Sequence, residues 1–287
     1  MKAFPIPVVA LGPGTQTEDE TLDYIAMPKD MDTWRPPVLP EPEALASRPK
    51  ARAALGCVLA LLDRAAQGEA GGQVSLLDLP AADLQLVNQL LGEGEASALV
   101  RAEGSTLEVR VQESVFAGVW RVMSFHAGVR VDDVVEVGPI PALLLAAADE
   151  DAESVYQPWR APLPPNVQNA PLLVEELRDQ IARWQPGNPP HVVNLTLLPV
   201  TPEDIAFLDH QLGTGRVLML SRGYGNCRIT NTRHPNCWRV VYYNSMDSVI
   251  LNTVEVVDMP EVAVAAPEDL RDSHTRLADV LAYLESA

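Results

Sequence analysis

Apolar residues recur at helical spacing in three segments of the chain, two of them internal and one at the C-terminus. A period of three to four residues predicts an amphipathic helix that buries one stripe. The stripes are Leu55, Val58, Leu59 and Leu62; Leu173, Leu177, Ile181 and Trp184; and Leu270, Leu277, Leu281 and Leu284. Cys57 falls inside the first segment, where we expect a small buried side chain.

Four β-rich runs follow one another between residues 216 and 257. They read RVLMLS, NCRITN, CWRVVYYN and SVILNTVEVV, with turn residues between them. This arrangement predicts an antiparallel meander. Just before it, Thr201 and Pro202 have the residue types of an N-cap and a first helical position, and Gly213 is suited to ending that helix.

The chain also contains an internal repeat. The sequence WRV at Trp120 recurs at Trp238, 118 positions later, and a second set of residues recurs at an offset of 121. The members of that set are Leu77, Asp83, Leu91, Gly92, Gly94, Leu99, Arg101 and Gly104, which match Leu198, Asp204, Leu212, Gly213, Gly215, Leu220, Arg222 and Gly225. We therefore predict an α+β fold of two tandem related units, each of helices plus an antiparallel meander, with pseudo-twofold symmetry.

Proline-rich stretches mark the predicted boundaries. Residues 1–50 contain PIP, GPG and RPPVLPEPE without a helical or strand period, and are expected to form an extended N-terminal arm. The first unit should span 51–155 and the second 171–287, with the C-terminal helix in the second. A proline-rich linker at 156–170 should join them.

Composition narrows the classes of function. The 287 residues include 39 acidic and 21 basic side chains, a net charge of −18 that disfavours nucleic acid as a partner. The chain has three cysteines, too few for a disulfide scaffold, and its apolar runs are too short for membrane insertion. We expect a cytoplasmic protein.

One segment departs from the acidic background. Between Gln211 and Met246 there is no aspartate or glutamate, and five arginines occur. A local positive region on a negative chain can select a carboxylate-bearing surface of a partner.

The chemistry of this segment favours binding over catalysis or metal coordination. Cys227 and Cys237 lack the Cys-x(2–4)-Cys spacing of structural zinc sites, so we expect neither a metal nor a cofactor. No general base with an orienting carboxylate accompanies Cys227, although neighbouring arginines could activate its thiol, so an enzyme is not expected. Tyrosine and arginine dominate binding energy at protein interfaces. The candidate partner-binding residues are Arg222, Tyr224, Asn226, Cys227, Arg228, Arg233, Tyr242, Tyr243, Asn244 and Asp247.

These motifs carry a family resemblance. The block GYGNCRI…NSMD…ILNTVEV, with MKAFPIPVVALGPG and DYIAMP near the N-terminus, resembles the hydrogenase expression/formation family called HupH, HyaF or HoxQ. The resemblance implies an accessory role in maturing uptake nickel–iron hydrogenases, without established catalysis. It also implies action on the immature iron–sulfur small subunit before export, together with a thioredoxin-like accessory chaperone.

Two alternatives remain open from the residues alone. Cys227 could assist assembly or protection of an iron–sulfur cluster by thiol chemistry. The protein could instead be a scaffold that links other maturation proteins through its N-terminal arm.

Overall fold

The computed structural model describes residues 40, 45–101, 104–152, 159–223 and 225–285. Most of the predicted arm and part of the predicted linker lie outside these residues. The described residues form two compact units. Among the described residues, the first unit combines residues 40–146 with Val217–Gly223 and residues 261–285, and the second combines Ala147–Arg216 with residues 225–260.

The first unit contains an antiparallel sheet in the strand order β1-β5-β4-β3-β2-β7. Its strands are β1 (Gly72–Ser75), β2 (Ala96–Arg101), β3 (Leu107–Glu113), β4 (Val119–His126), β5 (Val129–Val137) and β7 (Val217–Ser221). Its helices are α2 (Pro49–Ala66), α3 (Ala81–Leu91) and α7 (Pro267–Glu285), with the short η2 (Glu261–Ala263). The helix α4 (Ala142–Asp151) begins in the first unit and ends in the second.

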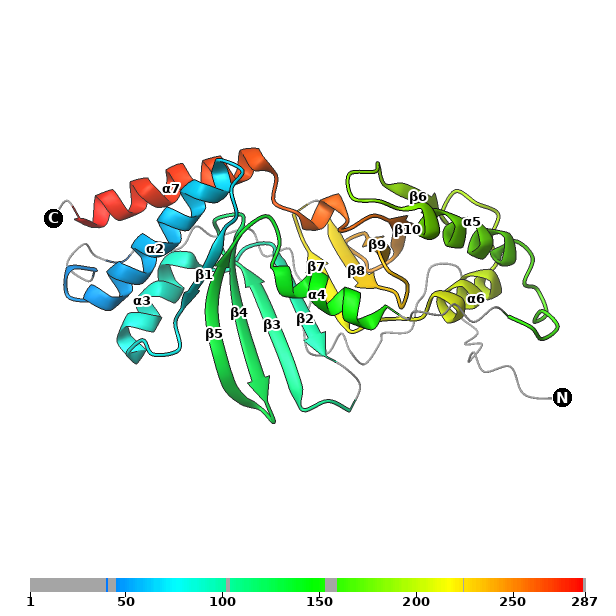
Figure 1. The fold of residues 1–287 in the computed structure, drawn as a ribbon, viewed down its shortest axis with the longest axis horizontal. Coiled ribbons are helices and arrows are strands. Elements are labelled where there is room, and N and C mark those ends of the chain that lie inside the picture. The colour runs from blue at the N-terminus through cyan, green and yellow to red at the C-terminus, as the bar shows by residue number, and fades with distance from the viewer. Residues whose placement is uncertain (1–39, 41–44, 102–103, 153–158, 224, 286–287) are drawn as a thin grey trace. The chain divides into compact units, whose positions relative to one another are not determined.

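The core of the first unit lies between one end of this sheet and the three helices. Leu55, Leu90 and Leu277 from the helices pack with Val119 and Val135 from the strands, all of them buried. Beyond these contacts β3, β4 and β5 continue past the helices (Figure 1). None of the described helices therefore lies over the far half of this sheet face.

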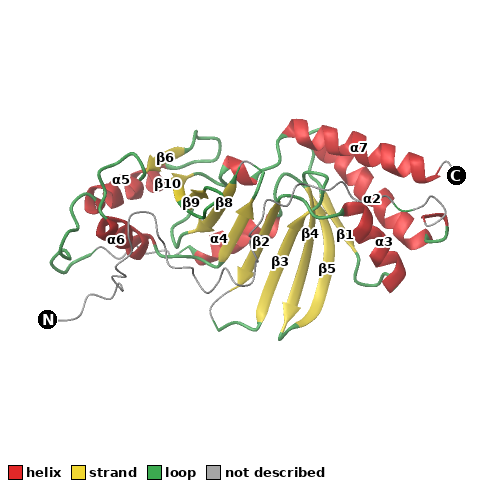
Figure 2. Ribbon diagram, turned by 180° about the vertical axis from the view of Figure 1, so that it is seen from behind, coloured by secondary structure: helices red, strands yellow, loops and turns green. Residues whose placement is uncertain are grey.

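The second unit repeats the plan on a smaller scale, with strand order β8-β9-β10-β6. The strands are β8 (Asn226–Asn231), β9 (Cys237–Tyr243), β10 (Val249–Val256) and β6 (His191–Asn194), and the helices are α5 (Ala170–Arg183) and α6 (Pro202–Leu212). Val174, Leu177 and Leu208 of the helices pack on Cys237 and Val254 of the sheet. Figure 2 shows the same helices and strands from behind. The predicted α+β class and the predicted runs β7 to β10 are confirmed.

Equivalent residues of the two repeats make equivalent contacts. The indole nitrogen of Trp120 donates to the carbonyl of Gly138 at 3.0 Å, and that of Trp238 donates to the carbonyl of Val257 at 3.2 Å. A helix N-terminus is capped in both units by a buried aspartate of the next helix. Asp83 of α3 accepts from the backbone of α2, and Asp204 of α6 accepts from the backbone of α5. Contacts of the same kind at repeated positions indicate a duplicated unit.

The compact units do not follow the predicted boundaries of the repeats. The strand β7 and the helix α7 belong by sequence to the second repeat, yet β7 pairs with β2 and α7 packs on α2 in the first unit. In the β2–β7 pair, Ala98 lies opposite Met219, the residue 121 positions later. Such a register is what a twofold relation between equivalent strands requires, and the overall pseudo-twofold symmetry stays a prediction.

Cys57 does not lie in the core. The described side chain is exposed on α2, while Leu55, Val58 and Leu62 take the buried positions. The expectation of a buried Cys57 is wrong because 100° per residue turns position 57 away from the stripe that includes 55, 58 and 62.

Candidate partner-binding face

Three of the predicted binding residues share one face of the second-unit sheet. In the β8–β9 register Asn226 lies opposite Tyr243, and Arg228 lies opposite Val241. Side chains alternate along a strand, so Asn226, Arg228 and Tyr243 point to the same side. The guanidinium carbon of Arg228 lies 5.9 Å from the centroid of the Tyr243 ring, within cation–π range.

Two further predicted residues, Cys227 and Tyr242, point to the opposite face. They lie directly across from each other, and the Cys227 side chain is 3% exposed. Burial raises the pKa of the Cys227 thiol to about 12, so the thiol is protonated at neutral pH. This environment does not favour nucleophilic chemistry.

The remaining second-unit positions lie in turns. Arg233 is in the β8–β9 hairpin, where its backbone N–H donates to Leu212 and its side chain packs beside Gly213. Asn244 organises the β9–β10 turn, its side-chain oxygen accepting from Met246 and Ser248. Asp247 has a φ of 56° in the same turn, a conformation that aspartate tolerates. The turn structure alone therefore explains why an asparagine occurs at position 244.

The last two predicted residues are not placed on this surface. Arg222 belongs to the first unit, where its backbone N–H donates to Glu95, and Tyr224 lies outside the described residues. A partner-binding role for the ten residues stays a prediction, and Asn226, Arg228 and Tyr243 are the three that share one face.

A buried arginine that the sequence argument did not select adjoins Arg228 on this face. Arg239 is 9% exposed and forms an ion pair with Asp209 of α6 at 3.3 Å. Its two terminal nitrogens make no hydrogen bond, nor does the side-chain oxygen of Asn252, which is 6% exposed. The strand register puts Asn252 on the same face, opposite Val241.

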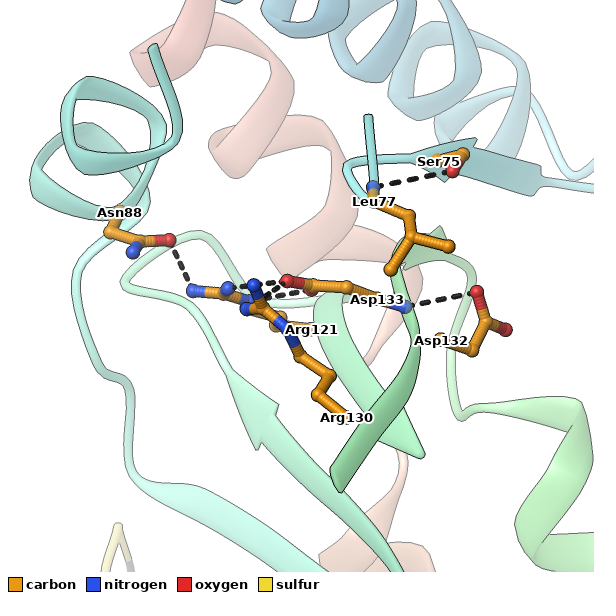
Figure 3. Close-up of polar contacts among 7 residues, drawn as sticks. All are labelled: Ser75, Leu77, Asn88, Arg121, Arg130, Asp132 and Asp133. Carbon is orange, nitrogen blue, oxygen red and sulfur yellow. Dashed lines mark hydrogen bonds and ion pairs between the residues drawn. The ribbon is translucent and has the colours of Figure 1, made fainter. Parts of the chain in front are cut away.

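The first unit has a closely related arrangement around Arg121, in which the carboxylate and the carboxamide have exchanged places between strand and helix. Arg121, 118 positions before Arg239, forms a bidentate contact with Asp133 of β5, from Nε at 2.9 Å and from Nη2 at 2.8 Å. Arg130 adds a third bond at 2.7 Å, and Asn88 of α3 accepts from Arg121 (Figure 3). The strand supplies the carboxylate and the helix the amide, whereas Asn252 and Asp209 reverse these roles in the second unit.

The same offset reveals a second pair of equivalent residues that the sequence patterns did not indicate. Counting 118 residues forward also takes Arg110 to Arg228 and Phe125 to Tyr243. The guanidinium carbon of Arg110 lies 4.8 Å from the Phe125 centroid, so both units hold an arginine over an aromatic ring. Arg228 is therefore not a feature of the second repeat alone.

Neither a metal site nor a membrane span emerges from the described part of the chain. No group of three or more histidine, cysteine, aspartate or glutamate residues there could hold a metal ion. Cys227 and Cys237 lie on opposite faces of the sheet, as the β8–β9 register shows. None of the helices in the described ranges is long and apolar enough to cross a bilayer.

The fold defines a duplicated α+β protein. The model of the family described as HupH hydrogenase expression protein, C-terminal conserved region, matches residues 50–158 and 167–284. The chain belongs to this family, and the double match agrees with the repeat.

Three curated relatives are similar over 96–100% of the chain. The hydrogenase expression/formation protein HoxQ of Cupriavidus necator is 52% identical over 289 residues, covering 100% of both chains. HupH of Rhodobacter capsulatus is 45% identical over 97% of each chain, and the hydrogenase-1 operon protein HyaF of Escherichia coli is 32% identical over 96% of each.

Proposed function

We propose that this protein is an accessory factor for maturation of a nickel–iron hydrogenase and binds the immature iron–sulfur small subunit before export. Family membership supports the maturation role, because the relatives are named as hydrogenase expression/formation proteins rather than as catalysts. The single observation that supports binding is the face formed by Asn226, Arg228 and Tyr243. It combines a guanidinium, an aromatic ring and a carboxamide, which are groups suited to hydrogen-bonded and stacked contacts with a protein.

The environment of Cys227 bears on the thiol alternative. A thiol that is 3% exposed and whose pKa is raised to about 12 is poorly suited to attack a substrate or ligate a cluster. We therefore give the binding function precedence. A thioredoxin-like accessory chaperone is the second partner that we propose, acting on the same client in the cytoplasm.

The test is recovery of the small-subunit precursor with tagged protein from cells that express the hydrogenase operon. We expect the precursor to co-purify with the wild-type chain and with Cys227→Ser, and to be lost with Arg228→Glu or Tyr243→Ala. Arg183→Glu, a charge reversal at a 73% exposed position on α5, is the control and should retain it. Loss with Cys227→Ser and retention with Arg228→Glu would replace this proposal with the thiol alternative. Recovery of other accessory proteins alone would favour the scaffold alternative.

A further inference from the structure

The half of the first-unit sheet that no described helix covers displays arginines on three of four neighbouring strands, namely β2, β3 and β5. Pairing places Arg101 opposite Glu108, Glu108 opposite Phe125 and Phe125 opposite Arg130, so these residues form one row across the sheet. The next row contains Arg110, opposite Met123. Residues directly opposite one another in antiparallel strands point to the same face, so both rows lie on one surface.

Much of this surface is open to solvent. The side chains of Arg101, Arg110 and Arg130 are 38%, 54% and 38% exposed, while Phe125 is half-buried between them. Two carboxylates lie among these arginines. Asp133 is fully buried and already accepts bonds from Arg121 and Arg130, and Glu108 pairs with Arg110 at 2.5 Å and with Arg101 at 3.8 Å. Among the described residues arginine is therefore in excess over carboxylate on this face, although the whole chain has a net charge of −18.

The repeat provides a second, independent argument. Arg110 and Phe125 recur as Arg228 and Tyr243, with the arginine over the ring in both units. Most positions of the two repeats differ, and the tryptophans that are shared, Trp120 and Trp238, are buried and explained by packing. Arg110 is more than half exposed, so packing does not account for its recurrence. An arginine–aromatic pair that recurs in both copies, with its arginine exposed in the first unit and half-buried in the second, indicates a surface used for recognition.

We propose that this first-unit surface docks a segment of a partner protein in which acidic side chains flank an apolar one. Carboxylates would pair with the guanidinium groups of Arg101, Arg110 and Arg130, which match carboxylate geometry. The apolar side chain would pack on Phe125 and Met123, because aromatic, methionine and arginine side chains are enriched in protein interfaces. This surface is distinct from the second-unit face proposed above, and either can fail without the other.

The experiment uses the full-length protein and a short fluorescein-labelled peptide with glutamates flanking leucine and phenylalanine. Anisotropy is measured between about 50 mM and about 500 mM NaCl, since exposed ion pairs are screened by salt. The rest of this acidic chain repels such a peptide, so binding requires a locally positive surface. We expect saturable binding that weakens with salt, and a loss of about tenfold or more with the double variant Arg110→Glu, Arg130→Glu.

Matched variants separate the outcomes. Arg64→Glu reverses a charge on α2 of the same unit at 50% exposure and should bind as the wild type does. Arg228→Glu, at the equivalent position of the second unit, should also retain the peptide. Arg110→Gln removes the charge without adding a new one and keeps the test valid if the double variant folds poorly. Unchanged affinity in the Arg110 variants, or equally tight binding of a peptide with lysine in place of glutamate, would overturn the proposal.

Discussion

Replacing Asp133 by asparagine should destabilise the first unit strongly. The Asp133 side chain is 0% exposed and accepts three hydrogen bonds, two from Arg121 and one from Arg130. Asparagine keeps the shape but presents an amide and leaves the two guanidinium groups without their carboxylate. Removing one partner of a buried ion pair costs about 3–5 kcal/mol. Arg121 and Arg130 are 19% and 38% exposed and can recover some hydration, so we expect a loss near the lower end, about 3 kcal/mol.

The assay is native-state hydrogen exchange read in peptides from β4 and β5. A chain with two compact units need not unfold in one step, so a local measurement is more direct than a global midpoint. A loss of about 3 kcal/mol corresponds to exchange more than a hundredfold faster in these peptides. Asp132→Asn removes an exposed carboxylate from the neighbouring position and should change exchange by less than about 1 kcal/mol.

A second-site change makes this prediction sharper. In the second unit the carboxylate comes from the helix, as Asp209, and the strand carries Asn252. The double variant Asp133→Asn, Asn88→Asp should therefore rebuild that arrangement around Arg121 and recover about 1–2 kcal/mol of the loss. The reasoning would be refuted if Asp133→Asn cost less than about 1 kcal/mol, or if Asn88→Asp brought no recovery.

Three further outcomes follow from the buried groups. Cys57 should be alkylated rapidly at about pH 8 in the native protein, while Cys227 and Cys237, whose pKa values burial raises to about 12, should react only after denaturation, as mass spectrometry can show. Burial raises the pKa of Glu113 from 4.5 to about 7. The folded state then holds this proton more tightly, so stability should fall by at most about 3 kcal/mol as pH rises from about 4.5 to about 7, and Glu113→Gln should abolish that slope in urea titrations. Burial of Asp204 would raise its pKa, but backbone N–H donors outweigh this and lower it. Its contribution should be present above pH 3.8 and lost as pH falls below that value, and Asp204→Ala should cost about 2 kcal/mol in urea unfolding.

Local patterns were sufficient to predict many individual elements. The helix α6 begins where Thr201 and Pro202 predict it, with the capping box completed by Asp204, and the four β-rich runs became β7 to β10. These elements are specified by neighbours in sequence, namely caps, turn residues and periodic apolar positions. The short strands β1 and β6 were not predicted, because four residues at a sheet edge carry too little periodicity to be distinguished from a loop.

The assignment of elements to compact units could not be predicted from the same patterns. The strand β7 and helix α7 carry the periodicity of ordinary elements, and nothing within them specifies the partner on which they pack. Their places in the first unit depend on β2 and α2, which are distant in sequence. The prediction of the candidate face was limited in the same way. Only the strand register shows that Arg228 and Tyr243 share a face and that Cys227 points away from them.

The comparison between repeats also shows why the sequence pattern pointed to only part of the surface. Candidate residues were sought in and next to the acid-free segment between Gln211 and Met246, which lies in the second repeat. Arg110 lies outside that segment, although it matches Arg228 in the repeat and is more than half exposed. The residues beside Arg121 and Arg239 show the complementary case. Asp133 and Asn252, both buried on the strands, differ in charge, and the helix residues Asn88 and Asp209 differ in the opposite sense. Each unit thus keeps one carboxylate beside the equivalent arginine, Arg121 or Arg239, and this carboxylate comes from a strand in the first unit and from a helix in the second. A difference at a single position is therefore compensated within the fold, whereas Arg110 is exposed and recurs as Arg228 without being required by a buried core, and it marks the surface on which binding should be sought.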